Sequence, residues 1–244
     1  MIIAYAKSDV GKAREMNQDA YYISDSSSDV KLYLLADGMG GYKGGEIASQ
    51  LAIKCTRNYI ENNLKDTPKD RESLLQLIAS SMEYANMVIY EKSKENKELE
   101  GMGTTLEVCL IYNSKAYIGH VGDSRIYRIR KNFMRKLTQD HSYVQKLVKD
   151  GTITKEEAEN HPKKNMLMKA LGCNAFVEPD VSVKGFLRDD ILLIASDGLT
   201  NMVKQEDIFS IATGNIEKAP IRLVELANDN GGLDNITVVV IKNI

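Results

Sequence analysis

Four aspartates of this sequence stand at the ends of β-type apolar runs, each with glycine close by. Asp37 ends the run of LLADGMGG, and Asp197 ends the run of DDILLIASDGLT. Asp123 lies between two such runs in YIGHVGDSRIY, and Asp234 comes just before ITVVVI. An Asp-Gly pair after a strand is first of all a turn signal. Strand ends of one sheet gather along one edge, so the repeated pattern also predicts that four carboxylates lie close together.

Carboxylates brought together in this way repel each other and raise each other's pKa unless a cation compensates them. Hard divalent cations such as Mg²⁺ and Mn²⁺ take all-oxygen ligands of this kind. The carbonyl of Gly38 is open to approach because glycine has no side chain. The residues alone leave two readings open: four independent turns, which Asp favours, or a site for several metal ions.

Two metal ions bridged by one carboxylate lower the pKa of a shared water and orient it for in-line attack, which suits the hydrolysis of a phosphate ester. Such a site needs a cation for the phosphate oxygens. Arg14 in GKAREMNQDAYY is the candidate, because its planar guanidinium binds phosphate through two bonds. The alternative for Arg14 is an ordinary surface arginine in a loop.

The order of the expected elements argues against an alternating β-α-β fold. Short strands are expected over residues 2–6, 21–23 and 31–36. Two helical patterns follow, over 47–59 and 74–89, in which apolar residues recur three to four positions apart. Further along, the runs TLEVCLIY, KAYIGHV, SRIYRIR and NFMRKLT are typical of an antiparallel meander.

The second half of the chain returns to strands and ends in one. Residues 142–170 are polar, rich in lysine and locally helical, with the capping-box pattern of Thr154 and Glu157, and are a candidate lid. Strands are expected in VSVKGFL and DDILLIAS, helices over about 203–229, and a last strand in ITVVVI. Runs of strands with grouped helices indicate an α+β fold in which helices cover antiparallel sheets.

Composition narrows the class of protein. With 244 residues the chain suits one large domain or two small ones, and its net charge of −2 gives no reason to expect a nucleic acid or an anionic membrane as partner. Cys55, Cys109 and Cys173 form no disulfide framework and no CxxC metal site, which indicates reduced thiols in a cytoplasmic protein. Neither a signal peptide nor an apolar run of membrane-spanning length is visible.

Other catalytic patterns are missing. The sequence holds no GxxxxGK[ST] phosphate loop, no HExxH, no GxSxG and no GxGxxG after a strand. His120 lies within an expected strand and is interpreted as a packed side chain. His141, in LTQDHS, has two readings, a structural one such as capping the following helical stretch and a place in the site. The structural reading is favoured.

Eight motifs occur in the order found in the metal-dependent Ser/Thr protein phosphatases of type 2C, the PPM family. The chain resembles the compact bacterial members over essentially its whole length, and the ordered set is specific although each motif alone is weak. The motifs are REMNQD at 14–19, LADGMGG at 35–41, GMGTT at 101–105, GHVGDSR at 119–125, LTQDHS at 137–142, KALG at 169–172, ASDGL at 195–199 and DNIT at 234–237.

The resemblance implies a four-layer α-β-β-α sandwich, two antiparallel sheets packed face to face with helices outside. It further implies one catalytic domain over 1–244 with a flap insert at about 142–170.

The resemblance also implies which residues hold metal. Asp37 would bridge two Mn²⁺ or Mg²⁺ ions, and the carbonyl of Gly38 would join the shell of the second. Asp197 and Asp234 would ligate the first ion, and Asp19 would act through a metal-bound water. Asp37, Asp197 and Asp234 are accordingly the expected catalytic residues.

Three further roles follow from the same likeness. Asp123, together with Asp197, matches a third, weaker metal site of bacterial relatives. Arg14 would bind the phosphate of the substrate. The 142–170 flap would border the active site and influence the choice of substrate.

Two departures from the family pattern affect the chemistry. Many eukaryotic members carry a histidine at the position of Met39, proposed there as general acid, and a thioether cannot donate a proton. The acid is therefore unassigned, with a water on the third ion as the preferred candidate. Gln18 stands where many members have glutamate, which removes one negative charge from the outer metal shell.

The activity implied is that of a cytoplasmic, Mn²⁺/Mg²⁺-dependent phosphatase acting on phosphoserine and phosphothreonine in proteins. A metal-bridging hydroxide would attack phosphorus directly, and no cysteine would serve as nucleophile. Phosphorylated proteins are the expected partners, together with a Ser/Thr kinase that the enzyme opposes, and the chain is expected to be a monomer. Two alternatives are a catalytically dead member acting as a binding module and a small-molecule phosphatase.

Overall fold

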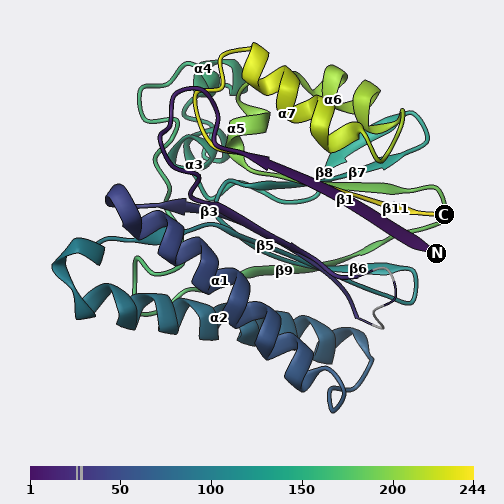
Figure 1. Cartoon of the computed structure of the whole chain (residues 1–244), viewed down its shortest axis with the longest axis horizontal. Helices are drawn as coiled ribbons and strands as arrows, with labels where there is room; N and C mark the ends of the chain where they lie inside the picture. The colour runs from purple at the N-terminus through teal and green to yellow at the C-terminus, as the bar shows by residue number, and fades with distance from the viewer. Residues whose placement is uncertain (26, 28–29) are drawn as a thin grey trace.

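Two antiparallel sheets packed face to face form the centre of the molecule, and helices cover the outer face of each (Figure 1). The structure is a computed structural model that describes residues 1–25, 27 and 30–244. The α+β class and the four-layer α-β-β-α sandwich predicted from the sequence are confirmed.

The strands of the two sheets come from all parts of the chain. Sheet I has the order β1-β11-β10-β7-β8, and sheet II has the order β2-β3-β5-β6-β9, with β4 paired to the end of β3. The strands of sheet I are β1 (Ile2–Asp9), β11 (Ile236–Asn243), β10 (Ile191–Ala195), β7 (Arg125–Arg130) and β8 (Phe133–Lys136). Those of sheet II are β2 (Asp19–Ile23), β3 (Lys31–Met39), β4 (Gly103–Thr104), β5 (Leu106–Tyr112), β6 (Lys115–Val121) and β9 (Asp180–Gly185).

The helices lie where the apolar periodicity predicts them. Sheet II is covered by α1 (Gly41–Asn63) and α2 (Arg71–Glu95), and sheet I by α6 (Gln205–Ala212) and α7 (Ala219–Asp229) (Figure 1). The remaining helical turns are η1 (Lys97–Leu99), α3 (Tyr143–Lys149), α4 (Lys155–Glu159) and α5 (Asp197–Thr200). The carboxylate of Asp70 accepts from the first free N–H groups of α2, which fixes where this helix begins.

Three apolar layers hold the sandwich together, one under each helix pair and one between the sheets. The layer between the sheets includes Leu35, Ile118, Ile194 and Val239, each at most 1% exposed. Burying a side chain of this size stabilises the fold by about 1.5–3 kcal/mol. Because β10 is buried on both faces, its sequence ILLIA is a continuous apolar run rather than an alternating one.

The prediction that β5 to β8 form one antiparallel meander is wrong at the connection between β6 and β7. β5 pairs with β6 and β7 pairs with β8, as predicted, but β6 and β7 belong to different sheets. The turn at Gly122, Asp123 and Ser124 therefore carries the chain from sheet II to sheet I. An apolar pattern reports that a strand is buried and does not distinguish which sheet it joins.

The prediction that the chain turns at Asp37 and Gly38 is also wrong. Both residues stay extended, and β3 continues to Met39 because Gly38 and Met39 pair with the short strand β4. The chain turns at Gly40, whose φ of 109° is in the region that favours glycine, and α1 begins at the next residue.

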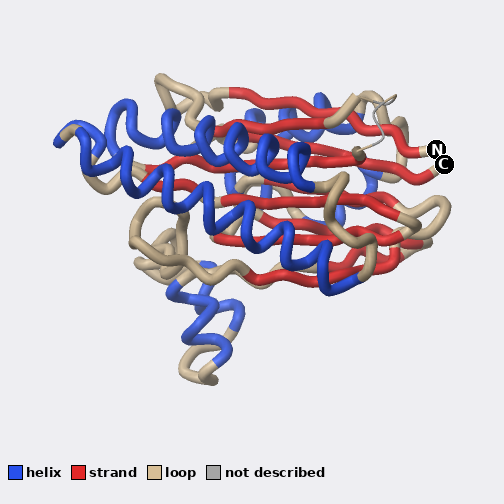
Figure 2. The backbone as a smooth tube through the Cα atoms, turned by 90° about the horizontal axis from the view of Figure 1, so that it is seen from below, coloured by secondary structure: helices blue, strands red, loops and turns tan. Residues whose placement is uncertain are grey.

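The 142–170 segment carries α3 and α4 and projects from the side of the sandwich (Figure 2). The predicted capping box of Thr154 and Glu157 is present, with both reciprocal hydrogen bonds. None of the helices in the described part of the chain combines the length and apolarity needed to cross a membrane.

Candidate active site

Five aspartates whose charges act on one another stand at strand ends or in turns next to them. These strand ends lie at the end of the sandwich away from the chain termini (Figure 1). Asp19 and Asp37 come from sheet II, Asp197 and Asp234 flank strands of sheet I, and Asp123 comes from the turn between the sheets. Burial raises the pKa of Asp37 well above its ordinary value, and the charges of the other four raise it further. The four carboxylates expected at one edge are thus brought together, although from two sheets rather than one.

Asp19 and Asp37 stand directly opposite each other on β2 and β3. Like charges in this register destabilise a sheet. Ser196 donates to Oδ2 of Asp19 at 2.8 Å, while Oδ1 is buried without a hydrogen-bond partner. Burial raises the pKa of Asp19 to about 7, opposed by hydrogen bonds from Thr237 and Ser196. The pair therefore holds an unsatisfied carboxylate oxygen next to a second carboxylate.

Two threonines fix the backbone of Asp37. Its N–H donates to Oγ1 of Thr105 at 2.9 Å, and its carbonyl accepts from the N–H of Thr105 and from Oγ1 of Thr104, both at 2.9 Å. The hydroxyl of Thr105 also bonds Ser124 at 2.9 Å, next to Asp123. A side chain at Gly38 would overlap the carbonyls of Gly45 and Gln18, so this position needs glycine.

His141 holds the turn that carries Asp123. Its main-chain N–H donates to the carbonyl of Gly122 at 2.7 Å, and the N–H of Gly122 donates to its Nδ1 at 3.1 Å. Because a backbone N–H can only donate, Nδ1 is the unprotonated nitrogen of the ring and Nε2 carries the proton. Nε2 lies 3.2 Å from Oδ2 of Asp180. The role is structural, as favoured, but it is not a helix cap, since Ser142 caps α3.

His120 is packed, as interpreted from the sequence. It is 2% exposed, bonds the buried carboxylate of Glu107 through Nδ1, and contacts the carbonyl of Gln139 at 2.8 Å through Nε2. Its ring lies 4.5 Å from that of His141, centre to centre. His120 thus supports the residue that holds the Asp123 turn.

Asp197 and Asp234 are placed by their neighbours. Asn201 donates to Asp197 at 3.1 Å, and burial together with the charge of Asp234 raises the pKa of Asp197 to about 6. The side chain of Asn235 accepts from the N–H of Gln18 at 2.8 Å and donates to two carbonyls of the loop that precedes β2. The same loop carries Arg14.

Arg14 is the cation at this cluster. Its Nη2 lies 2.9 Å from Oδ2 of Asp234, and its side chain is 56% exposed. The hydrogen bond and the charge of Asp234 raise the pKa of Arg14. Asp123 forms no ion pair with a described residue. Burial, and then the charges of Asp197 and Asp140, raise its pKa to about 7 against the opposing charge of Arg125.

The donor set fits hard divalent cations. It consists of carboxylates that raise each other's pKa, one buried oxygen without a partner, and a glycine carbonyl. Among the residues that the structure describes, no three acidic, histidine or cysteine side chains already converge in a ligand cage. Carboxylates that repel one another are expected to stand apart until a cation draws them together.

The side chain at position 39 and the cysteines offer no nucleophile or proton donor. Burial raises the pKa of Cys109 to about 12 and also raises that of Cys55 and Cys173. Met39 packs against Gly103 beside Cys173.

Sequence reasoning assigned no role to the polar residues that hold the acids in place. These residues are Thr105, Ser124, Asn235 and Ser196. For His141 a place in the site is the alternative reading of the sequence, and the structure adds its hydrogen bonds to Gly122. Thr105, Ser124 and Asn235 lie in or next to the motifs GMGTT, GHVGDSR and DNIT, so their position beside the predicted acids was the available signal.

Comparisons with known proteins agree on one family. The family described as Protein phosphatase 2C matches residues 11–217. Protein phosphatase PhpP of Streptococcus pneumoniae is 39% identical over 236 residues, 96% of this chain and 94% of that protein. The S. agalactiae serine/threonine phosphatase structure superposes with a TM-score of 0.92 at 36% identity and covers 100% of both chains. The catalytic domain of the serine/threonine phosphatase PstP, solved in complex with two manganese ions, superposes with a TM-score of 0.86 at 35% identity, covering 99% of this chain and 97% of that one.

Proposed function

Since the chain belongs to the protein phosphatase 2C family of enzymes, we propose that it is a metal-dependent phosphatase that hydrolyses phosphoserine and phosphothreonine in proteins. The observation that carries the proposal is the cluster of five carboxylates. In the described part of the chain, Arg14 is the one cation that forms an ion pair with any of them. The fold thus leaves several negative charges for cations from outside.

The roles proposed for the acids follow the family pattern. Asp37 would be shared by two Mn²⁺ or Mg²⁺ ions, with the Gly38 carbonyl on the second and Asp197 and Asp234 on the first. Asp19 would act through water. When bound, the ions would supply a water that is nucleophilic at neutral pH, which suits direct hydrolysis of a phosphate ester without a phosphoenzyme.

A third ion is proposed at Asp123, shared with Asp197. The raised pKa of Asp123, caused by burial and by Asp197, supports this role, because a cation between the two carboxylates would relieve their repulsion.

The chain's own residues orient these groups and the substrate. Thr105 and Ser196 hold Asp37 and Asp19 through the hydrogen bonds described above, and Asn235 ties the Arg14 loop next to Asp234. Arg14 is exposed enough to turn its guanidinium to the phosphate oxygens of a substrate. The proton for the leaving oxygen must come from a group other than Met39, whose thioether has none to give.

The wider assignments are proposals of the same kind. The chain would act as one catalytic domain over 1–244, with the 142–170 segment as a flap that borders the site. It would work in the cytoplasm as a monomer, on phosphorylated proteins, and would counteract a Ser/Thr protein kinase.

The experiment is hydrolysis of p-nitrophenyl phosphate and of a phosphothreonine peptide, with Mn²⁺ and with excess chelator. We expect turnover of both with Mn²⁺ and none in chelator. Asp197→Asn should abolish it, while Asp66→Asn, the same change at an exposed loop position, should leave it intact. Turnover in chelator, or full activity of Asp197→Asn, would overturn the mechanism.

Comparison of substrates separates the alternatives. A sugar phosphate turned over faster than the phosphopeptide would indicate a small-molecule phosphatase. No turnover of any substrate by the folded, Mn²⁺-loaded protein would indicate a binding module.

A further inference from the structure

A slot of about 250 Å³ opens between the two sheets on the side where β8 and β9 are the edge strands. Ile118 and His120 of β6 line it from within, Leu137 lines it after β8, and Ser182 and Lys184 line it from β9. Elsewhere the layer between the sheets is filled with apolar side chains. The sandwich is therefore left open and polar on this side.

Three cationic side chains lie in or next to the slot, and we call them the basic strip: Lys184, which lines the slot, and Arg128 and Arg135, which lie beside it on β7 and β8. Arg128 on β7 and Arg135 on β8 are directly opposite in register, and Lys184 lines the slot from β9. Arg128 points between the sheets because Ile126, two residues before it, packs in the layer between them. Arg135 shares this face as the cross-strand partner of Arg128.

The basic strip forms no ion pair among the described residues, and the nearby carboxylate of Asp190 is paired with Arg130. None of its three members forms an ion pair, and the guanidinium of Arg128 donates to the carbonyl of Gly185 instead. Two like charges directly opposite destabilise a sheet. Asp180 is the one acid among the residues that line the slot, and it lies at the other end. Lys169 pairs with it at 3.3 Å, and the neutral ring of His141 lies 3.2 Å from it.

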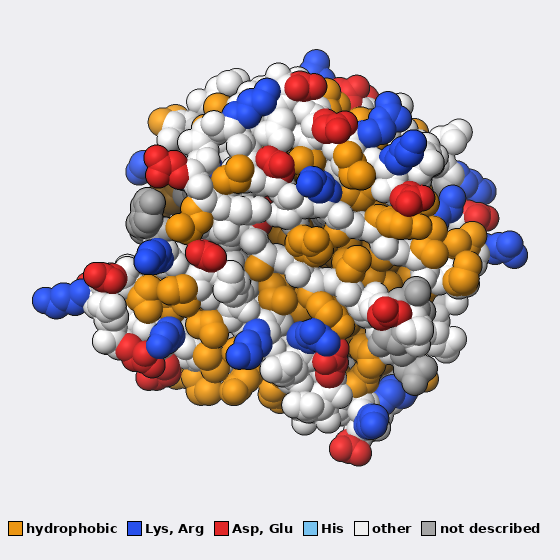
Figure 3. Space-filling view, in the orientation of Figure 1, with side chains coloured by type: hydrophobic (Ala, Val, Ile, Leu, Met, Phe, Trp, Pro, Cys, Tyr) orange, Lys and Arg blue, Asp and Glu red, His pale blue; other side chains and the backbone are white. Residues whose placement is uncertain are grey.

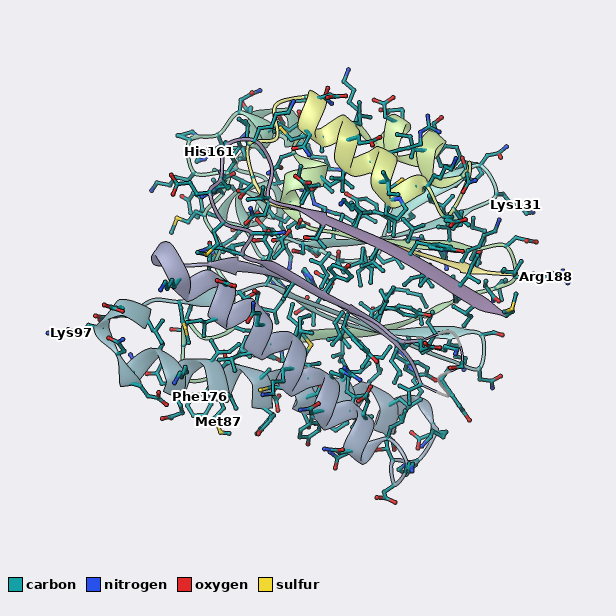
Figure 4. All side chains as sticks on the ribbon, in the orientation of Figure 1. Met87, Lys97, Lys131, His161, Phe176 and Arg188 are labelled. Carbon is teal, nitrogen blue, oxygen red and sulfur yellow. The ribbon has the colours of Figure 1, made fainter. Side chains whose placement is uncertain are left out.

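This concentration of positive charge is local. The whole chain has 32 basic and 34 acidic residues, and on the face seen in Figure 3 the two signs are interspersed. The turns at this end of the molecule carry Lys131 and Arg188, far from His161 (Figure 4). The turn of Arg188 also carries Asp189 and Asp190, so the positive charge is confined to the basic strip itself.

The edge of the slot can bind a peptide main chain. β9 pairs with β6 alone and β8 with β7 alone, so each has a free edge in the described part of the chain. An extended segment can add to such an edge through main-chain hydrogen bonds. Because side chains alternate along a strand, every second side chain of the added segment would point into the slot.

We propose that the slot and the basic strip bind an extended acidic segment of a phosphoprotein substrate, with anionic side chains at alternate positions paired to Arg128, Arg135 and Lys184. This docking role rests on the proposed function. β9 begins at Asp180, next to His141, which holds the Asp123 turn. The strand ends at Gly185, five residues later, which is about 16 Å along the strand. A substrate could thus occupy the active site and the basic strip together.

The shape of the site favours a peptide over the other polyanions. A slot of this volume between two sheet edges admits single side chains, whereas a lipid surface or a duplex is too broad to enter it. The net charge of −2 also gives no long-range attraction to such extended polyanions. The alternative explanation of the basic strip is that inward-pointing charges at edge strands prevent edge-to-edge aggregation. If that were the only role of the strip, the protein would bind no acidic peptide.

The first experiment measures binding by fluorescence anisotropy with a fluorescein-labelled eight-residue peptide of alternating glutamate and valine. It contains no phosphate, so the result does not depend on hydrolysis. We expect saturable binding that weakens with salt and falls about tenfold or more in Arg128→Gln/Arg135→Gln/Lys184→Gln. Lys54→Gln/Lys65→Gln/Lys97→Gln, which removes the same charge from exposed positions elsewhere, should bind as the unchanged protein does.

A second variant tests the proposal even if the triple variant does not fold. Arg135→Gln/Lys184→Gln keeps the Arg128 bond to Gly185 and should still weaken binding severalfold. No saturable binding, equal binding by both triple variants, or equally charge-dependent binding to vesicles of anionic lipid or to single-stranded DNA would overturn the proposal.

The second experiment measures kinetics with a phosphothreonine peptide joined by a flexible linker to the same acidic segment. In the Arg128→Gln/Arg135→Gln/Lys184→Gln variant, KM should rise about tenfold with kcat unchanged, while p-nitrophenyl phosphate turnover stays the same. An unchanged KM contradicts docking during catalysis. If p-nitrophenyl phosphate is not hydrolysed at all while the acidic peptide binds, the proposed function fails and the binding site stands.

Discussion

The protein holds its buried carboxylates in two opposite ways. Asp140, 8% exposed, accepts from Arg125 at 2.8 Å and from Lys136 at 2.9 Å. Burial alone would raise its pKa, but these two cations hold it below the ordinary value. At Asp37, burial and four neighbouring acids all raise the pKa, and no described residue forms an ion pair with it.

The difference shows what the carboxylate cluster is built for. The fold compensates a buried acid with its own arginine and lysine at Asp140, so it has the means to do so. Acids left without compensation cost stability in the free protein. They are consistent with a site whose compensating charge comes from bound cations.

The largest expected effect is that of Asp37→Asn. It removes the carboxylate proposed to be shared by two ions, so several kcal/mol of transition-state stabilisation are lost, which is about a thousandfold in rate or more. In chelator the same variant should be at least as stable as the unchanged protein, because a repelled charge is gone. Turnover of p-nitrophenyl phosphate and thermal unfolding in chelator measure the two parts. Retained activity would show that catalysis does not need the carboxylate of Asp37, and the contrast with Asp140 would then have no functional meaning.

Asp140→Asn should do the reverse. Removing one partner of a buried ion pair leaves Arg125 and Lys136 uncompensated and should lower the free energy of unfolding by about 3 kcal/mol. Urea unfolding in chelator measures it, with Asp37→Asn as the matched Asp-to-Asn change. A variant as stable as the unchanged protein would show that the two classes of acid do not differ as described.

Stability of the metal-free protein should fall as pH rises. Asp19 and Asp123 have pKa values raised by burial to about 7, above the ordinary 3.8, so between about pH 4 and 7 the folded state binds more protons than the unfolded one. The free energy of unfolding should drop by about 5 kcal/mol between pH 5 and 8, about half of it from each of the two groups. Saturating Mn²⁺ should remove this dependence, because ions bind the deprotonated carboxylates.

Urea unfolding at pH 5, 6.5 and 8, with chelator and with Mn²⁺, tests this expectation. Asp19→Asn should flatten the curve in chelator, since it removes one of the titrating groups. Stability that rises with pH in chelator would mean that the cluster acids are compensated within the fold.

The sequence predicts the elements of the fold better than their arrangement. The apolar patterns over 47–59 and 74–89 became α1 and α2, and the strands at Lys31 and Ile236 are where they were expected. Periodicity records which face of an element is buried. It does not record the partner sheet, so the crossing at Gly122 was missed and a meander was expected instead.

The candidate site shows the same limit. Asp37 and Asp197 could be identified because an apolar run ending in Asp-Gly is a local pattern. The residues that hold the acids act across long separations: Asn235 bonds the N–H of Gln18, and Thr105 bonds that of Asp37. Contacts of this kind depend on how the sheets pack, and one sequence does not contain that information.

The smallest expected effect concerns the support of Asp123. His141→Gln should lose the acceptor for the N–H of Gly122, whereas Asn places its Oδ1 near the position of Nδ1 and should keep it. Loss of this hydrogen bond should weaken Mn²⁺ binding at Asp123 and raise the half-saturating Mn²⁺ concentration about tenfold. Mn²⁺ titrations followed by electron paramagnetic resonance measure binding without turnover. Equal affinities for the Gln and Asn variants would assign His141 no part in placing Asp123.

The central claim is that the uncompensated acids bind cations, and a crystal of the protein soaked in Mn²⁺ tests it most directly. Anomalous-scattering density counts the ions and shows their ligands at once. We predict two peaks bridged by Asp37, with Asp197 and Asp234 on one of them, and a weaker third peak at Asp123. An ordered cluster without any anomalous peak, or peaks only at other acids such as Asp140, would contradict the account.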